Sequence, residues 1–230
     1  MEIESYLTLG IDDAGRGPVI GPMVLAGCLI DESIENEFKK LGVKDSKQLS
    51  PNRRESLAWL IKEKVIKFEV IKVEPYEIDG KDGNSLNLNQ IEAVKMAQII
   101  NKINEKTEKE KIKVILDCPS NNIKAWTEYL KKHINNKENL TISAEHKADV
   151  NHIAVSAASI LAKTTRDREI ELLKKKIGVD FGSGYPSDPV TKQFLKEYFE
   201  KHKKDGIFRE TWGTVAKHKK EKEQKKLGEF

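Results

Sequence analysis

Four aspartates stand where a folded chain would bring them together. Asp12 and Asp13 end an alternating apolar segment, Asp117 ends a short apolar run, and Asp149 opens a segment with helical spacing. In an α/β sheet, a site forms at the ends of neighbouring strands. Carboxylates that meet there repel one another unless a dication lies among them, and oxygen-only ligands suit Mg²⁺ or Mn²⁺. Two such ions about 3.5–4 Å apart turn water into a nucleophilic hydroxide and stabilise the leaving oxygen of a phosphodiester.

The alternative interpretation gives these acids ordinary structural roles. Asp117 and Asp149 could be caps or surface acids, and Asp149 in particular suits a helix N-cap. Strand alternation also points Asp12 and Asp13 to opposite faces of a sheet. Both reach one site only if the backbone bends there, and Gly15 and Gly17 just beyond make such a bend feasible.

The elements that must position the acids follow from hydrophobic periodicity. The predicted strands are residues 6–12, 19–30, 65–73, 114–116 and 140–144. The predicted helices are residues 33–41, 50–64, 87–105 and 123–134, a long helix opened by Asp149, and then 190–203 and 214–227. Ser50 is a suitable N-cap, with Pro51 in the first turn. The first two strands form an antiparallel hairpin, and the whole pattern predicts a mixed α/β sheet with a helical C-terminal appendage.

The composition is that of a globular chain. It has 230 residues, of which 38% are hydrophobic and 34% charged, so a disordered protein is excluded. The formal net charge is +4 and the isoelectric point about 8.8. This small surplus of positive charge permits a polyanionic partner without requiring one.

Cysteine and histidine usage argues against zinc and disulfides. Cys28 and Cys118 are far apart and form no CxxC pattern, so a reducing compartment fits, and Cys118 suits a small core residue. His146 and His152 flank Asp149, but a third well-spaced ligand for zinc is missing. The N-terminus has no basic leader, and the longest apolar stretch is interrupted by glycine and proline. We therefore expect a cytoplasmic protein without membrane association.

Short blocks of sequence add a resemblance to a known family. Together they resemble the signature of ribonuclease HII, and the archaeal members most of all. They run in family order from residue 12 to residue 188 and cover most of the chain. The blocks are Asp12–Pro18, Gly21–Met23, Lys44–Lys47, Leu116–Asp117, His146–Asp149, Val155–Ile160, Ala162–Lys163, Arg166–Asp167 and Gly182–Asp188.

The resemblance implies an RNase H-like fold and metal-dependent hydrolysis that leaves a 3′-hydroxyl and a 5′-phosphate. The implied substrates are the RNA strand of RNA/DNA hybrids and ribonucleotides embedded in duplex DNA, incised on their 5′ side for ribonucleotide removal. The implied cofactor is Mg²⁺ or Mn²⁺ in a two-metal site. By motif position, the catalytic, metal-binding acids are Asp12, Asp13, Asp117 and Asp149.

Substrate-binding residues carry over in the same way. Gly15, Arg16 and Gly17 match the loop that reads the ribose 2′-hydroxyl, and Tyr185 matches the tyrosine that senses the junction with DNA. The chemistry agrees, because glycines let backbone groups approach closely and the 2′-hydroxyl separates RNA from DNA. An aromatic ring can stack on a sugar or base.

Three further residues are candidate contacts to the nucleic-acid backbone. Ser46 and Lys47 lie in a loop before a helix, a suitable place for phosphate, although a solvated loop is the alternative. Lys163 lies fourteen residues after Asp149 on the predicted helix, about 21 Å along its axis, so we expect it to hold the substrate or to support packing. The tail from 217 to 226 could bind phosphates or form a solvated helix.

One position departs from the family pattern. The family usually has Glu where this chain has Asp13, and the shorter side chain holds its carboxylate about 1.5 Å nearer the backbone, a displacement that can cost about a hundredfold in rate. We hypothesise a natural variant with a slightly shifted second metal, or an engineered substitution that weakens activity. A catalytically weakened, hybrid-binding variant is therefore the alternative function.

The expected organisation is one catalytic domain with an extension. Residues 1–180 would form the RNase H-like domain, and residues 181–230 the helical extension that completes the substrate groove. The short segment before Asp12 favours type HII over HIII. A DNA nuclease of the same fold is a rival interpretation, which the intact 2′-hydroxyl loop disfavours. We expect a monomer.

Overall fold

The protein is built around one five-stranded sheet. In this computed structural model, residues 6–44, 46–105, 107 and 110–217 are described. The strands are β1 (Leu7–Ala14), β2 (Met23–Ile30), β3 (Lys67–Val73), β4 (Ile112–Asp117) and β5 (Leu140–Glu145). Their order in the sheet is β3-β2-β1-β4-β5. Strand β1 pairs antiparallel with β2 and parallel with β4, and β4 pairs parallel with β5, so the predicted mixed sheet is confirmed.

Helices flank the sheet, as predicted. They are α1 (Glu32–Leu41), α2 (Pro51–Lys64), α3 (Pro75–Ile78), α4 (Leu88–Asn104), α5 (Ile123–Lys131), α6 (Ala148–Asn151), α7 (Ile153–Ile177) and α8 (Pro189–His202), with a 3₁₀ turn at Ser46–Gln48. Local signals set several boundaries: Ser50 caps α2 through its side chain, and Asn87 forms a capping box with Gln90 at the start of α4.

The chain divides into two compact units. We call the first the sheet unit, made of the described residues among 1–14, 24–72 and 86–165, and the rest the second unit, made of those among 15–23, 73–85 and 166–230. This division is discontinuous and differs from the predicted boundary at residue 180. The catalytic domain 1–180 and extension 181–230 stay a prediction about function.

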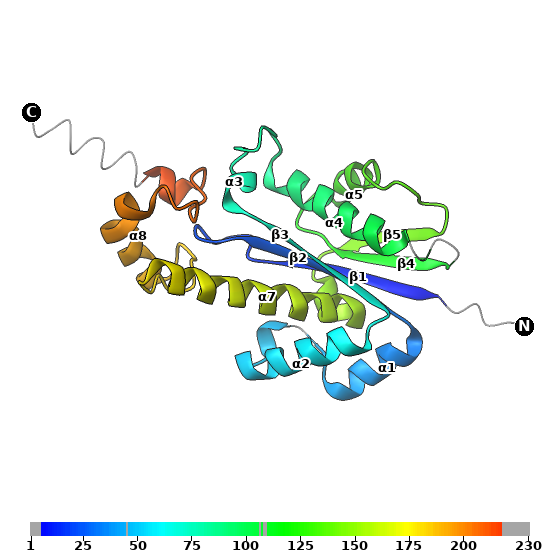
Figure 1. The fold of residues 1–230 in the computed structure, drawn as a ribbon. Coiled ribbons are helices and arrows are strands. Elements are labelled where there is room, and N and C mark those ends of the chain that lie inside the picture. The colour runs from blue at the N-terminus through cyan, green and yellow to red at the C-terminus, as the bar shows by residue number, and fades with distance from the viewer. Residues whose placement is uncertain (1–5, 45, 106, 108–109, 218–230) are drawn as a thin grey trace, which may run out of the picture. The chain divides into compact units, whose positions relative to one another are not determined.

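Within the sheet unit, both faces of the sheet are covered (Figure 1). Helices α1, α2 and the first half of α7 pack on one face, and α4 and α5 cover the other. Gly10 in β1 lets α7 approach closely, because a Cβ there would lie 2.2 Å from backbone atoms of Ala154 and Val155. Even-numbered residues of β1 therefore face α7, and this determines where Asp12 points.

The structure corrects three predicted elements. The second strand begins at Met23 instead of residue 19, because Ile20 forms an isolated bridge with Phe208. Helix α5 ends at Lys131, three residues early. The long helix predicted to open at Asp149 is two helices, α6 and α7, separated by the extended residue His152.

A side chain accounts for the break between α6 and α7. The Ser156 hydroxyl donates to the carbonyl of Asp149 at 2.6 Å, in place of a helical N–H. The same hydroxyl lies 3.1 Å from the carbonyl of His152. Serine hydroxyls compete with the backbone for such carbonyls, and here the competition separates two helices.

The predicted C-terminal helix, residues 214–227, is described only in part. Residues 213–217 are helical. The rest of that helix, and the tail from 218 to 226, lie outside the described residues. Among the described helices, none combines the length and the apolar character needed to cross a membrane.

Candidate active site

Acidic residues lie near the carboxyl ends of two neighbouring strands, as the sequence predicts, and a third acid lies beside them on β5. The last paired residues of β1 and β4 are Ile11 and Leu116, so Asp12 and Asp117 follow side by side. Asp117 is in turn paired with Glu145 at the end of β5. Residues in register on neighbouring strands project from the same face. The carboxyl edge of the parallel strands therefore carries a row of carboxylates.

Asp12 is the electrostatic centre of this row. Its side chain is only 4% exposed, and burial raises the pKa of Asp12 well above the ordinary value. The negative charges of Asp13 and Asp117 raise that pKa further. Hydrogen bonds from the Ser159 side chain and the Asp13 backbone N–H, the latter at 2.7 Å, act in the opposite direction. An ionised Asp12 is costly in this arrangement, and a bound cation would remove the cost.

Asp13 comes near Asp12 without the expected bend. The β1–β2 pairing continues from Asp12 opposite Ala26 through Ala14 opposite Val24, so the strand stays regular across both acids. A shared site was expected only if the backbone bends here, and the pairing shows no bend, so a place for Asp13 in the same site as Asp12 stays a prediction. The two charges still interact at this spacing, because Asp13 raises the pKa of Asp12.

Asp117 and Asp149 are linked through the start of α6. A carboxylate oxygen of Asp117 accepts a hydrogen bond from the N–H of Ala148 at 2.9 Å. Asp149 follows Ala148 and is 5% exposed. The N-cap of α6 is Lys147, in the left-handed region with φ 58°, so Asp149 is not the cap. The capping alternative thus describes one part of Asp117's role, and Asp149 is buried in the turn that Asp117 holds.

A pair of buried serines supports Asp12 from α7. The hydroxyls of Ser159 and Ser46 lie 2.9 Å apart, and the two residues are 4% and 3% exposed. Ser159 therefore connects Asp12 to the loop that carries Ser46. The Ser46 side chain is directed inward, and the side chain of Lys47 lies outside the described residues. Phosphate binding by this loop stays a prediction.

Lys163 lies on α7, one turn beyond Ser159, and is half-buried. Asp149 lies on α6, so the predicted separation of about 21 Å along one helix rests on a wrong premise. A contact between Lys163 and nucleic acid stays a prediction.

The two histidines that a zinc site would use each have another partner. Within the described part of the chain, no three His, Cys, Asp or Glu side chains are already arranged to hold a metal ion of any kind. His152 instead pairs with Glu145 at 2.7 Å, and His146 contacts the carbonyl of Cys118 at 2.9 Å. Cys118 is buried, as a small core residue would be.

In the second unit, the glycine loop Gly15–Gly17 is held by side chains distant in sequence. Arg209 is fully buried and donates to the carbonyls of Gly15, Arg16 and Gly21 at 2.7, 2.9 and 3.0 Å. The sequence analysis missed Arg209, because no periodicity or motif connects it to a loop about 190 positions earlier.

Tyr185 belongs to the same cluster of the second unit. A Cβ on Gly17 would lie 3.4 Å from the Tyr185 ring, and the Arg166 guanidinium lies 5.3 Å from the ring centroid. Arg166 also contacts Gly15, where φ is +85° and a Cβ would come within 2.3 Å of the arginine side chain. Glycine is therefore required at position 15 by conformation and by space. The two predicted substrate-binding elements, Gly15–Gly17 and Tyr185, are thus neighbours.

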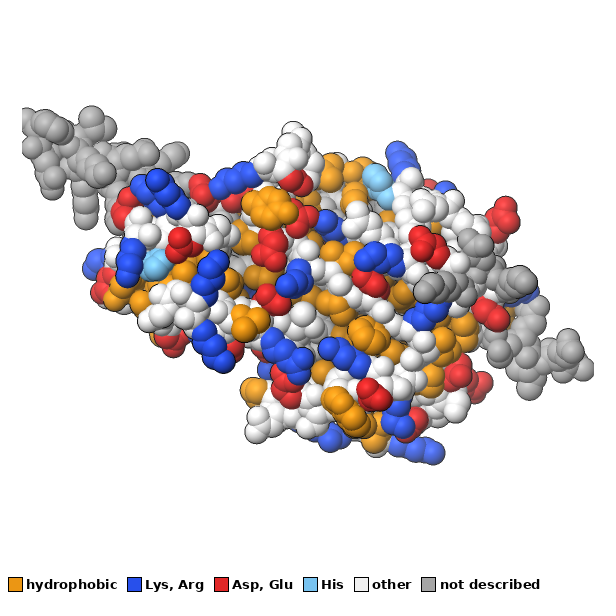
Figure 2. Space-filling view, viewed as in Figure 1, with side chains coloured by type: hydrophobic (Ala, Val, Ile, Leu, Met, Phe, Trp, Pro, Cys, Tyr) orange, Lys and Arg blue, Asp and Glu red, His pale blue; other side chains and the backbone are white. Residues whose placement is uncertain are grey.

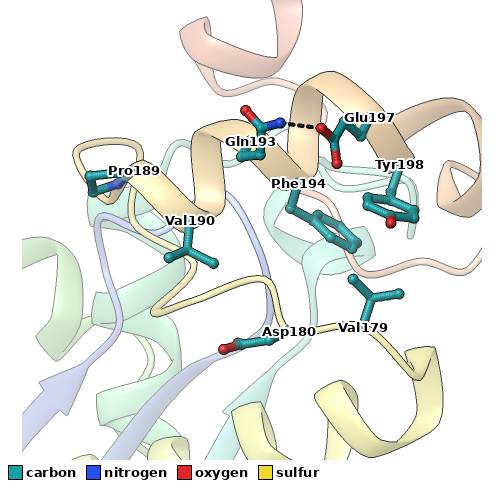
Figure 3. A pocket seen from close by; sticks show the side chains of 8 residues that line it. All are labelled: Val179, Asp180, Pro189, Val190, Gln193, Phe194, Glu197 and Tyr198. Atoms are coloured by element: carbon teal, nitrogen blue, oxygen red, sulfur yellow. Dashed lines mark hydrogen bonds between the residues drawn. The ribbon is translucent and has the colours of Figure 1, made fainter.

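Two surface features lie apart from these residues. Over the face in Figure 2, Lys and Arg side chains are interspersed with Asp and Glu instead of gathering in one patch. A cavity of about 430 Å³ is lined by α8 together with Val179 and Asp180 (Figure 3). Its lining includes Gln193 and Glu197 on α8, whose side chains are hydrogen-bonded to each other. None of the predicted site residues lines this cavity.

Removing the Ser159 hydroxyl is expected to shift cation binding toward higher pH. That hydroxyl lowers the pKa of Asp12, so in Ser159→Ala the pKa rises further and the carboxylate ionises only at higher pH. Calorimetric titration of Mn²⁺ across a pH series should show the midpoint of binding moved upward. Ser46→Ala keeps the direct contact to Asp12 and should shift the midpoint less; an unmoved midpoint in folded Ser159→Ala would contradict the expectation.

Comparison with known proteins agrees with the sequence signature. The family model described as ribonuclease HII matches residues 9–215. The ribonuclease HII of Pyrococcus furiosus is 44% identical over 209 residues, 90% of this chain and 89% of the relative. The crystal structure of ribonuclease H2 from Pyrococcus horikoshii superposes with a TM-score of 0.82 at 42% identity, covering 94% and 98% of the two chains. The RNase HII solved in complex with PCNA from Archaeoglobus fulgidus superposes with a TM-score of 0.77 at 40% identity, covering 90% of this chain and 95% of the relative.

Proposed function

Since this chain belongs to the ribonuclease HII family, we propose that it incises duplex DNA on the 5′ side of embedded ribonucleotides by a two-metal mechanism. Membership of the family already makes the chain a metal-dependent nuclease with an RNase H-like fold, which cuts the RNA strand of RNA/DNA hybrids. The observation that carries the proposed mechanism is the buried Asp12, whose pKa is raised by burial and by two neighbouring acids.

The four aspartates fit divalent cations by their chemistry. Asp12, Asp13, Asp117 and Asp149 offer carboxylate oxygens only, the ligands that Mg²⁺ and Mn²⁺ prefer. The acids are not arranged as a finished cage, so we infer that their side chains shift when cations bind. The bound ions would supply a hydroxide nucleophile and stabilise the leaving oxygen, which yields a 3′-hydroxyl and a 5′-phosphate.

The protein's own groups would prepare this site. Ser159 and the Asp13 N–H hold the Asp12 carboxylate in one orientation through hydrogen bonds. Asp117 is fixed by the N–H of Ala148, which keeps the start of α6 beside it. Such prior orientation lowers the cost of assembling the reactive geometry.

Recognition of the substrate is assigned to the second unit and to α7. We propose that backbone groups of Gly15–Gly17 read the 2′-hydroxyl, and that Tyr185 stacks where ribose gives way to deoxyribose. Tyr185 is 37% exposed, so its ring is available for stacking. Lys47 and Lys163 would contact phosphates, whereas Ser46, whose side chain is buried against Ser159, would support the loop from inside.

One cleavage assay tests the proposal. The substrate is a DNA duplex with a single ribonucleotide, beside an RNA/DNA hybrid and an all-DNA duplex, each with Mg²⁺, Mn²⁺ or EDTA. We expect metal-dependent cutting of the hybrid and incision only on the 5′ side of the single ribonucleotide. Cutting of the all-DNA duplex would favour a DNA nuclease. Tight binding without cleavage in either metal would favour the catalytically weakened variant.

The oligomeric state and partners are separate proposals. We propose a monomer, which light scattering after gel filtration would test. The Archaeoglobus relative was solved with PCNA, so a sliding clamp is the first protein partner to add to that experiment.

A further inference from the structure

The loop Gly15–Gly17 presents its carbonyl oxygens to the segment around Arg209. The guanidinium of Arg209 donates three hydrogen bonds to backbone carbonyls. Its Nε, Nη1 and Nη2 groups donate to Gly21, Arg16 and Gly15, in that order. The indole Nε1–H of Trp212 donates a hydrogen bond to the carbonyl of Gly17 at 3.3 Å. Every carbonyl of the three-residue loop is therefore bound from one direction.

Peptide geometry turns this into a statement about the N–H groups. In a trans peptide, the carbonyl of one residue and the N–H of the next point in opposite directions. Because the carbonyls of Gly15 and Arg16 point at the Arg209 guanidinium, the N–H groups of Arg16 and Gly17 point away from it. Arg209 thereby determines the direction of the two backbone donors that a ribose hydroxyl would meet.

Arg209 is itself fixed by its neighbours. The carboxylate of Asp79 accepts hydrogen bonds from the N–H of Glu210 at 2.8 Å and from the N–H and hydroxyl of Thr211 at 3.1 and 2.7 Å. The Trp212 ring lies 5.2 Å from the guanidinium. The N–H of Arg209 also binds the carbonyl of Val19 at 3.0 Å. The side chain that holds the loop thus comes from a segment that is itself hydrogen-bonded to Asp79 and Val19.

We propose that Arg209 is a positioning residue for discrimination between ribose and deoxyribose. It orients the backbone donors of Gly15–Gly17 without touching the substrate, and Trp212 assists at Gly17. The inference rests on the proposed function, because it assigns a further residue to the loop proposed to read the 2′-hydroxyl. Lysine would not substitute, since a single ammonium cannot reproduce three donors in a planar fork.

The test separates recognition of ribose from binding of nucleic acid. In Arg209→Lys, kcat/KM per folded protein is measured on a duplex with one ribonucleotide, with an all-DNA duplex as competitor for its inhibition constant. We expect kcat/KM to fall at least about tenfold, as for a lost hydrogen bond to a charged group. The inhibition constant of the all-DNA duplex should stay within about twofold, because the charge is kept.

Two further variants separate positioning from loss of stability. Leu195→Ala removes a buried side chain of α8 and should lower the melting temperature while leaving both constants unchanged per folded protein. Trp212→Phe keeps an aromatic ring but removes the N–H that donates to Gly17, and it should reduce kcat/KM severalfold. This variant tests the inference if Arg209→Lys does not fold. If wild type cleaves the ribonucleotide duplex and the folded variants keep its kcat/KM, this inference alone is overturned. If wild type does not cleave it, the proposed function fails and the inference with it.

Discussion

Replacing Asp12 with Asn is expected to abolish cleavage and at the same time to stabilise the metal-free protein. Asp12 is the most buried of the four acids, and Asp13 and Asp117 act on its charge. If Asp12 is a ligand of the proposed cation site, the site loses a carboxylate in this variant, and we expect the rate to fall at least about a thousandfold. The free energy of unfolding should nevertheless rise, because the negative charge that Asn removes is unfavourable in the folded, metal-free state.

The dependence on pH follows from the same shift. The folded pKa of Asp12 is raised above the ordinary value of 3.8, so the folded protein binds the proton more tightly than the unfolded chain. Stability therefore falls as pH rises from the unfolded pKa to the folded one and stays low above it. Asp12→Asn should lose this component, so its advantage should be largest at neutral pH and shrink in acid.

Thermal unfolding in EDTA measures this effect, with a rise of about 2–4 °C corresponding to about 1 kcal/mol in a chain of this size. Glu138→Gln, at an exposed glutamate in the turn before β5, controls for removal of a negative charge. Added Mg²⁺ or Mn²⁺ should then stabilise wild type more than Asp12→Asn. A variant less stable than wild type in EDTA would show that Asp12 is an ordinary structural acid.

The second large effect is expected from Asp13→Glu. The added methylene would move the carboxylate about 1.5 Å outward, to where the family usually has it, and misplacement of that size can cost about a hundredfold in rate. We therefore expect faster cleavage, by up to about that factor, with Mg²⁺ and Mn²⁺ tested separately. Unchanged rates in both metals would refute the idea that Asp13 limits this enzyme.

A matched lengthening at a neighbouring acid provides the control. The Asp117 carboxylate is held by the N–H of Ala148, so Asp117→Glu breaks an existing contact and should slow the reaction. A faster cleavage rate in both variants would point to a general effect of longer acidic side chains on the site. A faster rate in Asp13→Glu alone would identify the shorter acid at this position as a limit on the rate.

The sequence by itself determined the local structure and the identity of the acids. Strand β1 follows from the alternation of Leu7, Leu9 and Ile11, and the start of α2 follows from Ser50 as an N-cap. The edge that gathers Asp12 and Asp117 was also predictable, because parallel strands end on one side of a sheet. These features depend on neighbours in the chain or on one rule of topology.

The tertiary structure alone decided what supports these residues. The contacts of Ser159 with Ser46, and of Arg209 with the loop at Gly15, join positions more than a hundred residues apart. No periodicity encodes such a pair, because each partner satisfies its hydrogen bonds only once the core has placed both segments. The break at His152 is different in kind, because it arises locally: the Ser156 hydroxyl, seven residues after Asp149, replaces a backbone donor that helical spacing had predicted. Local pattern thus specifies which groups can do chemistry, and long-range packing specifies which groups hold them in place.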